Sequence, residues 1–174
     1  SRGSVSNCLN GSKPEDLGAV VFVSCTGGFE SPSIAYHLEL PDLPRDVRFM
    51  HIGASGCSGA FPGLDVAVDY FKAHKRPVLL IVTEICSSTF FPEFGSPDPT
   101  NDYEVLRANA IFADASVSAL IGNDSDWRHP EIIDSENYYC PEFLSELGYT
   151  WSDGRLRVLL SKRVPSLAPL VVVP

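Results

Sequence analysis

Short apolar runs on either side of one long amphipathic segment constrain the fold of this chain more than any other feature. Residues 19–23, 47–52 and 77–82 are short runs rich in Val, Ile, Leu and Phe; the first and third are uninterrupted, whereas the second contains Arg48 and His51. Such runs are typical of strands that are buried on both faces of a sheet. Between the second and third runs, apolar residues recur at the spacing of one helix face. These residues are Ala60, Leu64, Ala67, Val68 and Phe71.

Strand, helix and strand in this order predict an α/β fold with a layered core and a mixed or parallel sheet. Residues 1–16 are polar, and we expect them to be irregular. Residues 17–174 contain no linker, and we expect them to belong to one domain. The remaining expected elements are helices over 32–40 and 102–112, a loop over 90–100, strands over 115–121, 132–139 and 155–161, and a helix that opens at 164–165.

Composition excludes several classes of function. The net charge is −9 and no basic cluster is present, which argues against nucleic acid or an anionic membrane surface as a partner. No apolar run approaches membrane-spanning length, and the polar start does not resemble a signal peptide. The five cysteines form no C-x-x-C pair and the four histidines no H-x-x-x-H pair, so we expect no disulfide framework and no metal site. Reduced thiols predict a cytoplasmic protein.

The stretch from 50 to 64, MHIGASGCSGAFPGL, is the most informative for chemistry. A buried strand ends in small residues, Cys57 follows, and the amphipathic helix starts directly behind it. The first N–H groups of a helix are unpaired and carry partial positive charge, which stabilises a thiolate. Gly53, Gly56 and Gly59 allow a sharp turn and the close approach of a thioester. The alternative from residue type alone is that Cys57 is a small buried apolar residue.

Several segments in the same order resemble chalcone- and stilbene-synthase-like type III polyketide synthases, which are thiolase-fold condensing enzymes. Residues 56–60, Gly-Cys-Ser-Gly-Ala, resemble the active-site cysteine motif of that family. The other matching segments are 23–32 (VSCTGGFESP), 84–90 (EICSSTF), 109–114 (NAIFAD) and 160–165 (LSKRVP). Together they cover about residues 18 to 170, and their order and spacing carry the resemblance.

The resemblance implies an acyltransferase that uses acyl-CoA and malonyl-CoA, with no permanently bound cofactor. Cys57 would take a starter acyl group from coenzyme A and condense it with malonyl-CoA by decarboxylative Claisen chemistry. Phe112 would act as the gatekeeper beside it, although a core aromatic residue on a helix face fits equally well. The family also implies a homodimer.

Further residues receive a place from the resemblance. Those that would line the substrate pocket are Thr26, Thr89, Ser31 and Val158. Those that would be structural near the site are Glu84, Asp114, Gly56 and Gly59. Both threonines also fit a local role, because strand-end and loop hydroxyls often bond to nearby backbone.

Members of the family are roughly twice as long, and their mechanism also needs a histidine and an asparagine from the second half. We therefore expect an incomplete fold, mostly the N-terminal half, that is inactive by itself; the alternative is a natural short subunit. His51 lies on an expected buried strand and is not a candidate base. Two other functions stay open: a ketoacyl synthase III-like enzyme that makes one condensation or joins two acyl chains, and a non-catalytic partner subunit. The starter, the number of extensions and the cyclisation mode are not encoded in these residues.

Overall fold

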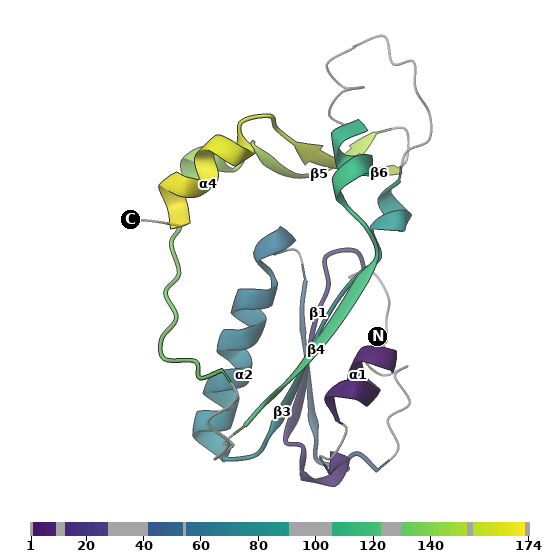
Figure 1. Cartoon of the computed structure of the whole chain (residues 1–174), viewed down its shortest axis with the longest axis vertical. Helices are drawn as coiled ribbons and strands as arrows, with labels where there is room; N and C mark the ends of the chain where they lie inside the picture. Colours follow the sequence, from purple (N-terminus) through teal and green to yellow (C-terminus); the bar gives the residue numbers. More distant parts are fainter. Residues whose placement is uncertain are drawn as a thin grey trace. The chain divides into compact units, whose positions relative to one another are not determined.

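The computed structural model describes residues 2–9, 13–27, 42–53, 55–90, 106–122, 130–152 and 155–172. The chain divides into two compact units (Figure 1). The first unit comprises Ser1–Glu84 and Asp114–Ser135, and the second comprises Ile85–Ala113 and Glu136–Pro174. Each unit is described by itself below. The expected helix over 32–40 and residues 91–100 of the expected loop lie outside the described residues.

A four-stranded mixed sheet forms the centre of the first unit, with the strand order β2-β1-β3-β4. The strands are β1 (Ala19–Val23), β2 (Arg48–Ile52), β3 (Val78–Glu84) and β4 (Ala115–Ile121). β1 pairs in parallel with β2 and with β3, whereas β4 runs antiparallel to β3. The three runs and the expected strand over 115–121 are therefore confirmed as strands of a mixed sheet. The expectation that the strand over 47–52 is buried was wrong, because β2 is an edge strand on which Arg48 and His51 are exposed.

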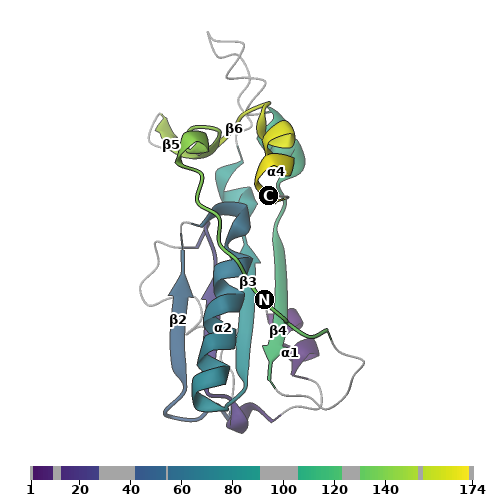
Figure 2. The same ribbon diagram turned by 90° about the vertical axis from the view of Figure 1, so that its left-hand side faces the viewer.

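Two helices cover opposite faces of this sheet (Figures 1 and 2). α2 (Ala60–His74) buries Ala67 against one face, and α1 (Arg2–Cys8) buries Val5 against the other. Every residue of β1 is buried, because Val20 and Phe22 pack with Val5 while the alternate residues of the strand pack with Ala67. The sequence pattern of a strand covered on both sides is thus explained by one helix on each face.

Two expectations for irregular and extended segments were wrong. The described part of residues 1–16 is not irregular, because α1 spans Arg2–Cys8 and a 3-10 turn spans Pro14–Asp16. Tertiary contacts stabilise α1: Val5 is buried, and the Ser4 hydroxyl lies 2.9 Å from the hydroxyl of Ser118 in β4. Residues 130–140 form no strand, although they contain apolar residues. Ile133 is 91% exposed there, and a strand requires pairing and packing as well as β propensity.

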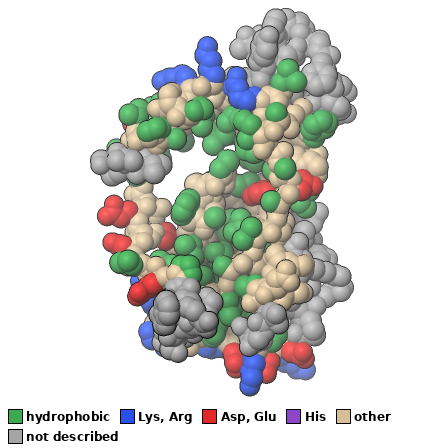
Figure 3. Space-filling view, in the orientation of Figure 1, with side chains coloured by type: hydrophobic (Ala, Val, Ile, Leu, Met, Phe, Trp, Pro, Cys, Tyr) green, Lys and Arg blue, Asp and Glu red, His purple; other side chains and the backbone are tan. Residues whose placement is uncertain are grey.

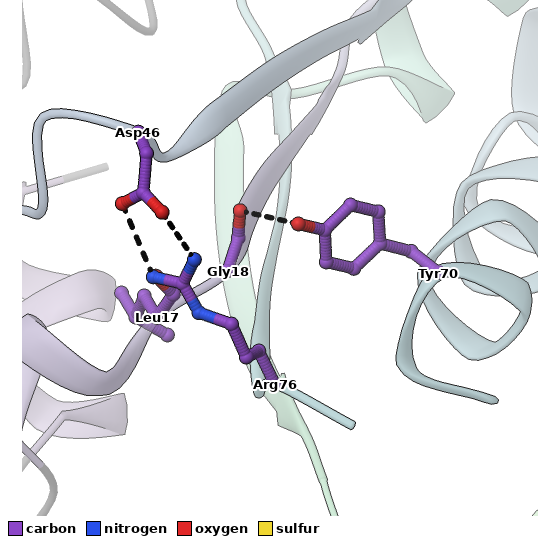
Figure 4. A network of polar contacts seen from close by, with 5 residues as sticks. All are labelled: Leu17, Gly18, Asp46, Tyr70 and Arg76. Atoms are coloured by element: carbon purple, nitrogen blue, oxygen red, sulfur yellow. Dashed lines mark hydrogen bonds and ion pairs between the residues drawn. The ribbon is translucent and has the colours of Figure 1, made fainter. Parts of the chain in front are cut away.

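A polar network fixes the end of the first unit at which β1 begins (Figure 4). Arg76 donates to both carboxylate oxygens of Asp46, at 2.7 and 3.4 Å, and to the carbonyl of Leu17 at 2.7 Å. The Tyr70 hydroxyl donates to the carbonyl of Gly18 at 2.9 Å. The Arg76 guanidinium, as hydrogen-bond donor, lowers the pKa of Asp46. The network links the end of α2 to the residues that lead into β1 and β2.

Hydrophobic side chains also remain at the surface of the first unit. Phe61 in α2 and Val117 in β4 are 67% and 65% exposed. The space-filling view shows hydrophobic side chains on the side on which β4 lies (Figure 3). Exposed apolar side chains that gather in this way are typical of surfaces that pack against other protein, or of an aggregation risk.

The second unit contains an antiparallel hairpin of β5 (Leu147–Ser152) and β6 (Arg155–Leu160). α4 (Val164–Val172) follows, and residues 106–111 are helical. Short 3-10 turns span Cys86–Thr89 and Pro141–Phe143. The expected strand over 155–161 and the helix opening at 164–165 are confirmed, whereas β5 was not predicted. Among the described residues, no helix is long and apolar enough to span a membrane.

Candidate active site

Cys57 lies in the turn that joins the sheet to the helix α2. β2 ends at Ile52, a 3-10 turn spans Gly56–Ser58, and α2 begins at Ala60. The N–H of Gly59 donates to the carbonyl of Gly56 at 3.0 Å, so the turn runs directly into the helix. The Cys57 side chain is exposed. The structure therefore places the thiol at the start of α2 and open to solvent.

Two glycines shape this turn and its packing. Gly56 has a φ of +59°, a left-handed conformation that glycine adopts without the steric cost other residues meet. Gly63, in the first turns of α2, is buried against the sheet. A Cβ atom at Gly63 would stand 2.5 Å from Cγ2 of Val23 and 3.1 Å from Cδ1 of Leu80. Gly63 thus lets the first turns of α2, and with them Cys57, approach β1 closely.

The carboxylate of Glu84 organises the loop that follows β1. Its Oε1 accepts the N–H of Cys25 at 2.8 Å. Its Oε2 accepts the N–H of Thr26 at 3.1 Å and the Thr26 hydroxyl at 2.8 Å. Hydrogen bonds to an ionised carboxylate are stronger than those between neutral groups. Glu84, at the end of β3, therefore holds residues 25 and 26 at the carboxyl ends of the parallel strands, where β2 leads to Cys57.

Cys25 connects this loop to the turn that carries Cys57. Its Sγ lies 3.4 Å from the carbonyl oxygen of Gly56 and donates to it. Burial and the nearby carboxylate of Glu84 raise the pKa of Cys25, so this thiol stays protonated at neutral pH. Sequence reasoning missed Cys25 as a member of the site. Its position directly after a buried strand, next to Thr26, is the signal that could have identified it.

The structure brings some of the expected site residues together. Cys57, Gly56 and Gly59 share one turn, and the carboxylate of Glu84 binds Thr26. Asp114 is exposed and precedes β4, whose first residue pairs with Glu84. Ser31 lies outside the described residues.

Three expected pocket residues, Phe112, Thr89 and Val158, belong to the second unit. The half-buried Phe112 follows the helical residues 106–111, and its N–H donates to the carbonyl of Ala108 at 3.1 Å. The Thr89 hydroxyl donates to the carbonyl of Cys86 at 2.9 Å, which is the local role considered above for threonines. Val158 lies in β6, which contacts the 3-10 turn containing Thr89. The pocket roles of these residues stay predictions.

The described residues contain no group of three His, Cys, Asp or Glu side chains that could hold a metal ion. The chemistry that the described site can support is nucleophilic. An exposed thiol stands in the 3-10 turn Gly56–Ser58, which runs directly into α2. Unpaired backbone N–H groups at the start of a helix favour negative charge that develops nearby.

Comparison with known proteins agrees with this geometry. A protein of Bacillus subtilis (strain 168) that carries the name chalcone synthase is 33% identical over 186 residues, which is 96% of this chain and 48% of the relative. The structure of a type III pentaketide synthase from Neurospora crassa matches with a TM-score of 0.79 at 21% identity, over 97% of this chain and 47% of that one. The structure of CsyB in complex with coenzyme A matches with a TM-score of 0.78 at 21% identity, over 97% of this chain and 48% of that one.

No family model matches the chain. The chain spans about half the length of the curated relative and of the solved structures that it matches. These matches confirm the expected thiolase-like α/β fold.

Proposed function

Because this chain is related in sequence and fold to about half of a type III polyketide synthase, we propose that it is the nucleophile-bearing part of an acyltransferase of that kind. Cys57 takes a starter acyl group from an acyl-CoA and holds it as a thioester for condensation with malonyl-CoA. The observation that carries the proposal is the position of the Cys57 thiol in the 3-10 turn that runs directly into α2.

The proposed loading step is a thiol exchange. The Cys57 thiolate attacks the carbonyl carbon of the acyl-CoA, and the negative charge moves to the carbonyl oxygen. When this intermediate collapses, the bond from carbon to the coenzyme A sulfur breaks, and the coenzyme A thiolate leaves and takes a proton from solvent. Backbone N–H groups of the turn and of the first turn of α2 stabilise both the attacking thiolate and the oxyanion.

The proposed condensation step uses the loaded thioester. Malonyl-CoA loses carbon dioxide, and the carbon of the resulting enolate attacks the carbonyl carbon of the Cys57 thioester. A carbon–carbon bond forms, and the Cys57 thiolate leaves. Groups from the half of the family fold that this chain does not span would complete the site, so the step belongs to the whole protein.

Acyl loading of the full-length protein tests the proposal. The protein is incubated with acyl-CoA starters, digested, and analysed by peptide mass spectrometry for an acyl group on Cys57. We expect the wild type to carry the acyl group on Cys57 and Cys57→Ala to carry none. Cys140→Ala is the matched control, because it also removes one thiol, and it should load like the wild type. An acyl group that persists on the Cys57→Ala protein, or its absence from the wild type with every starter, would refute the proposal.

The products formed with malonyl-CoA separate the proposed reaction from a single condensation. Several extender units per product support a type III polyketide synthase. One extension per product, or the joining of two acyl chains, instead supports the ketoacyl synthase III-like alternative. Isotope-labelled malonyl-CoA gives the number of extender units directly from the product mass.

A further inference from the structure

The thiol of Cys25 contacts the backbone directly before the proposed nucleophile. Its Sγ lies 3.4 Å from the carbonyl oxygen of Gly56, and that carbonyl belongs to the peptide bond whose N–H is the N–H of Cys57. Because a peptide unit is planar, a restrained carbonyl restrains the direction of the N–H at its other end.

The Gly56 carbonyl accepts a second hydrogen bond, from the N–H of Gly59 at 3.0 Å. Two donors, one from the β1 loop and one from the turn itself, therefore hold the same oxygen. Gly56 itself has a positive φ, in a conformation where glycine has more freedom than other residues. A flexible residue at this point benefits from an external contact that selects one orientation of the Gly56–Cys57 peptide.

Glu84 places Cys25 for this contact. Its Oε1 accepts the Cys25 N–H at 2.8 Å, and its Oε2 binds both the N–H and the hydroxyl of Thr26. The Ser24 hydroxyl accepts the N–H of Gly27 at 2.9 Å and closes the loop. The Glu84 carboxylate also opposes ionisation of the Cys25 thiol, so the thiol is available as a donor. The loop backbone is thus held from both sides, and the Cys25 sulfur is left to face the turn.

We propose that Cys25 is a positioning residue for Cys57: its S–H holds the Gly56–Cys57 peptide so that the Cys57 N–H and thiol keep one orientation at the start of α2. The inference rests on the proposed acyl transfer for its catalytic consequence. Its structural basis is the contact between Cys25 and Gly56, which does not depend on the substrate.

The experiment compares Cys25→Ala and Cys25→Ser in the full-length protein. Alanine removes the donor, whereas serine keeps an O–H donor at the same branch point. We expect Cys25→Ala to lower the maximal rate of Cys57 acylation about tenfold with little change in the starter concentration for half-maximal rate, the effect of losing one hydrogen bond. Cys25→Ser should recover most of the rate. Cys8→Ala removes a partly buried thiol that packs with the core cluster containing Val5, and it should acylate like the wild type.

A second readout separates this inference from the proposed function. Alkylation of Cys57 by iodoacetamide, followed by peptide mapping across pH, needs no acyl transfer. We expect the alkylation rate of Cys57 at neutral pH to fall severalfold in Cys25→Ala and to recover in Cys25→Ser. If the wild type accepts no acyl group but shows this pattern, the acyl-transfer proposal fails and the positioning inference stands. Equal acylation and alkylation in the wild type and Cys25→Ala, or a loss that serine does not restore, would overturn the inference.

Discussion

The close contact between α2 and β1 predicts that Gly63→Ala destabilises the protein although alanine is the better helix former. The added Cβ would stand 2.5 Å from Cγ2 of Val23 and 3.1 Å from Cδ1 of Leu80. Val23 is buried and its branched side chain has little freedom at χ1, so it cannot turn away. The helix or the strand must therefore shift to admit one methyl group.

The size of the expected stability change in Gly63→Ala follows from two opposing effects. Replacing glycine by alanine in a helix interior favours folding by about 1 kcal/mol. Forcing an extra methyl group into a packed core costs about 1–3 kcal/mol, and a separation of 2.5 Å from a rigid atom places this site toward the upper end. We expect a net loss of about 1–2 kcal/mol in the free energy of unfolding. For a chain of this size the unfolding midpoint should fall by about 2–8 °C.

Urea denaturation of the wild type and the variant measures this difference. Gly3→Ala is the matched control, because Gly3 also lies in a helix and a Cβ there would meet nothing within 4 Å. That substitution should leave stability unchanged or raise it by at most about 1 kcal/mol. The same substitution is thus expected to destabilise the protein at Gly63 but not at Gly3.

A double variant tests whether Val23 is the cause. Val23→Ala removes the nearest atom, so Gly63→Ala on that background should be neutral or stabilising, with a coupling of about 1–3 kcal/mol between the two sites. A Gly63→Ala protein as stable as the wild type would refute the packing argument. So would an equal loss in the presence and absence of the Val23 side chain.

Three further predictions concern the rest of the first unit. Val5→Ala should lower the free energy of unfolding by about 2 kcal/mol in urea denaturation, because two buried carbons are lost between α1 and the sheet, and a loss near zero would contradict the docking of α1. Tyr70→Phe should cost about 1 kcal/mol in the same assay, since it removes the hydrogen bond to the Gly18 carbonyl, and equal stability would show that the bond contributes nothing net. The pKa of Asp46 is lowered by its hydrogen bond with Arg76, so its contribution to stability is present above its ordinary pKa and is lost as the pH falls through the lowered value. Urea midpoints from about pH 6 to about pH 2 should therefore fall more in the wild type than in Asp46→Asn, and parallel curves would exclude this role.

Much of the first unit could be predicted from local sequence patterns. An apolar run such as residues 19–23 predicts a strand because side chains on both of its faces need cover, and the single apolar stripe of Ala60–His74 predicts a helix against one side. α1 was missed because Val5 is the one fully buried residue among its described side chains, a signal too weak to recognise in seven residues. β5 was missed although Asp153-Gly154, a typical hairpin dipeptide, separates it from β6.

The candidate site, too, could be predicted from the sequence only in part. The position of Cys57 in the fold could be predicted because strand, glycine turn and helix are adjacent in the sequence, so local spacing determines where the thiol lies. The hydrogen bond from Cys25 to Glu84 joins residues 59 positions apart, and that from Cys25 to Gly56 joins residues 31 positions apart. Contacts of this kind depend on which strands become neighbours in the sheet. A pattern within one segment does not contain that information.

The complete burial of β1 has a consequence for how the protein responds to heat. Its backbone N–H groups should exchange with deuterium only when the whole unit opens, because both faces and both edges of this strand are covered. Cys25 and Thr26 follow this strand directly, so the loop that contacts the turn of Cys57 is tied to the slowest-exchanging segment. Warming should then inactivate the protein in a single step together with its unfolding, without an earlier loosening of that loop.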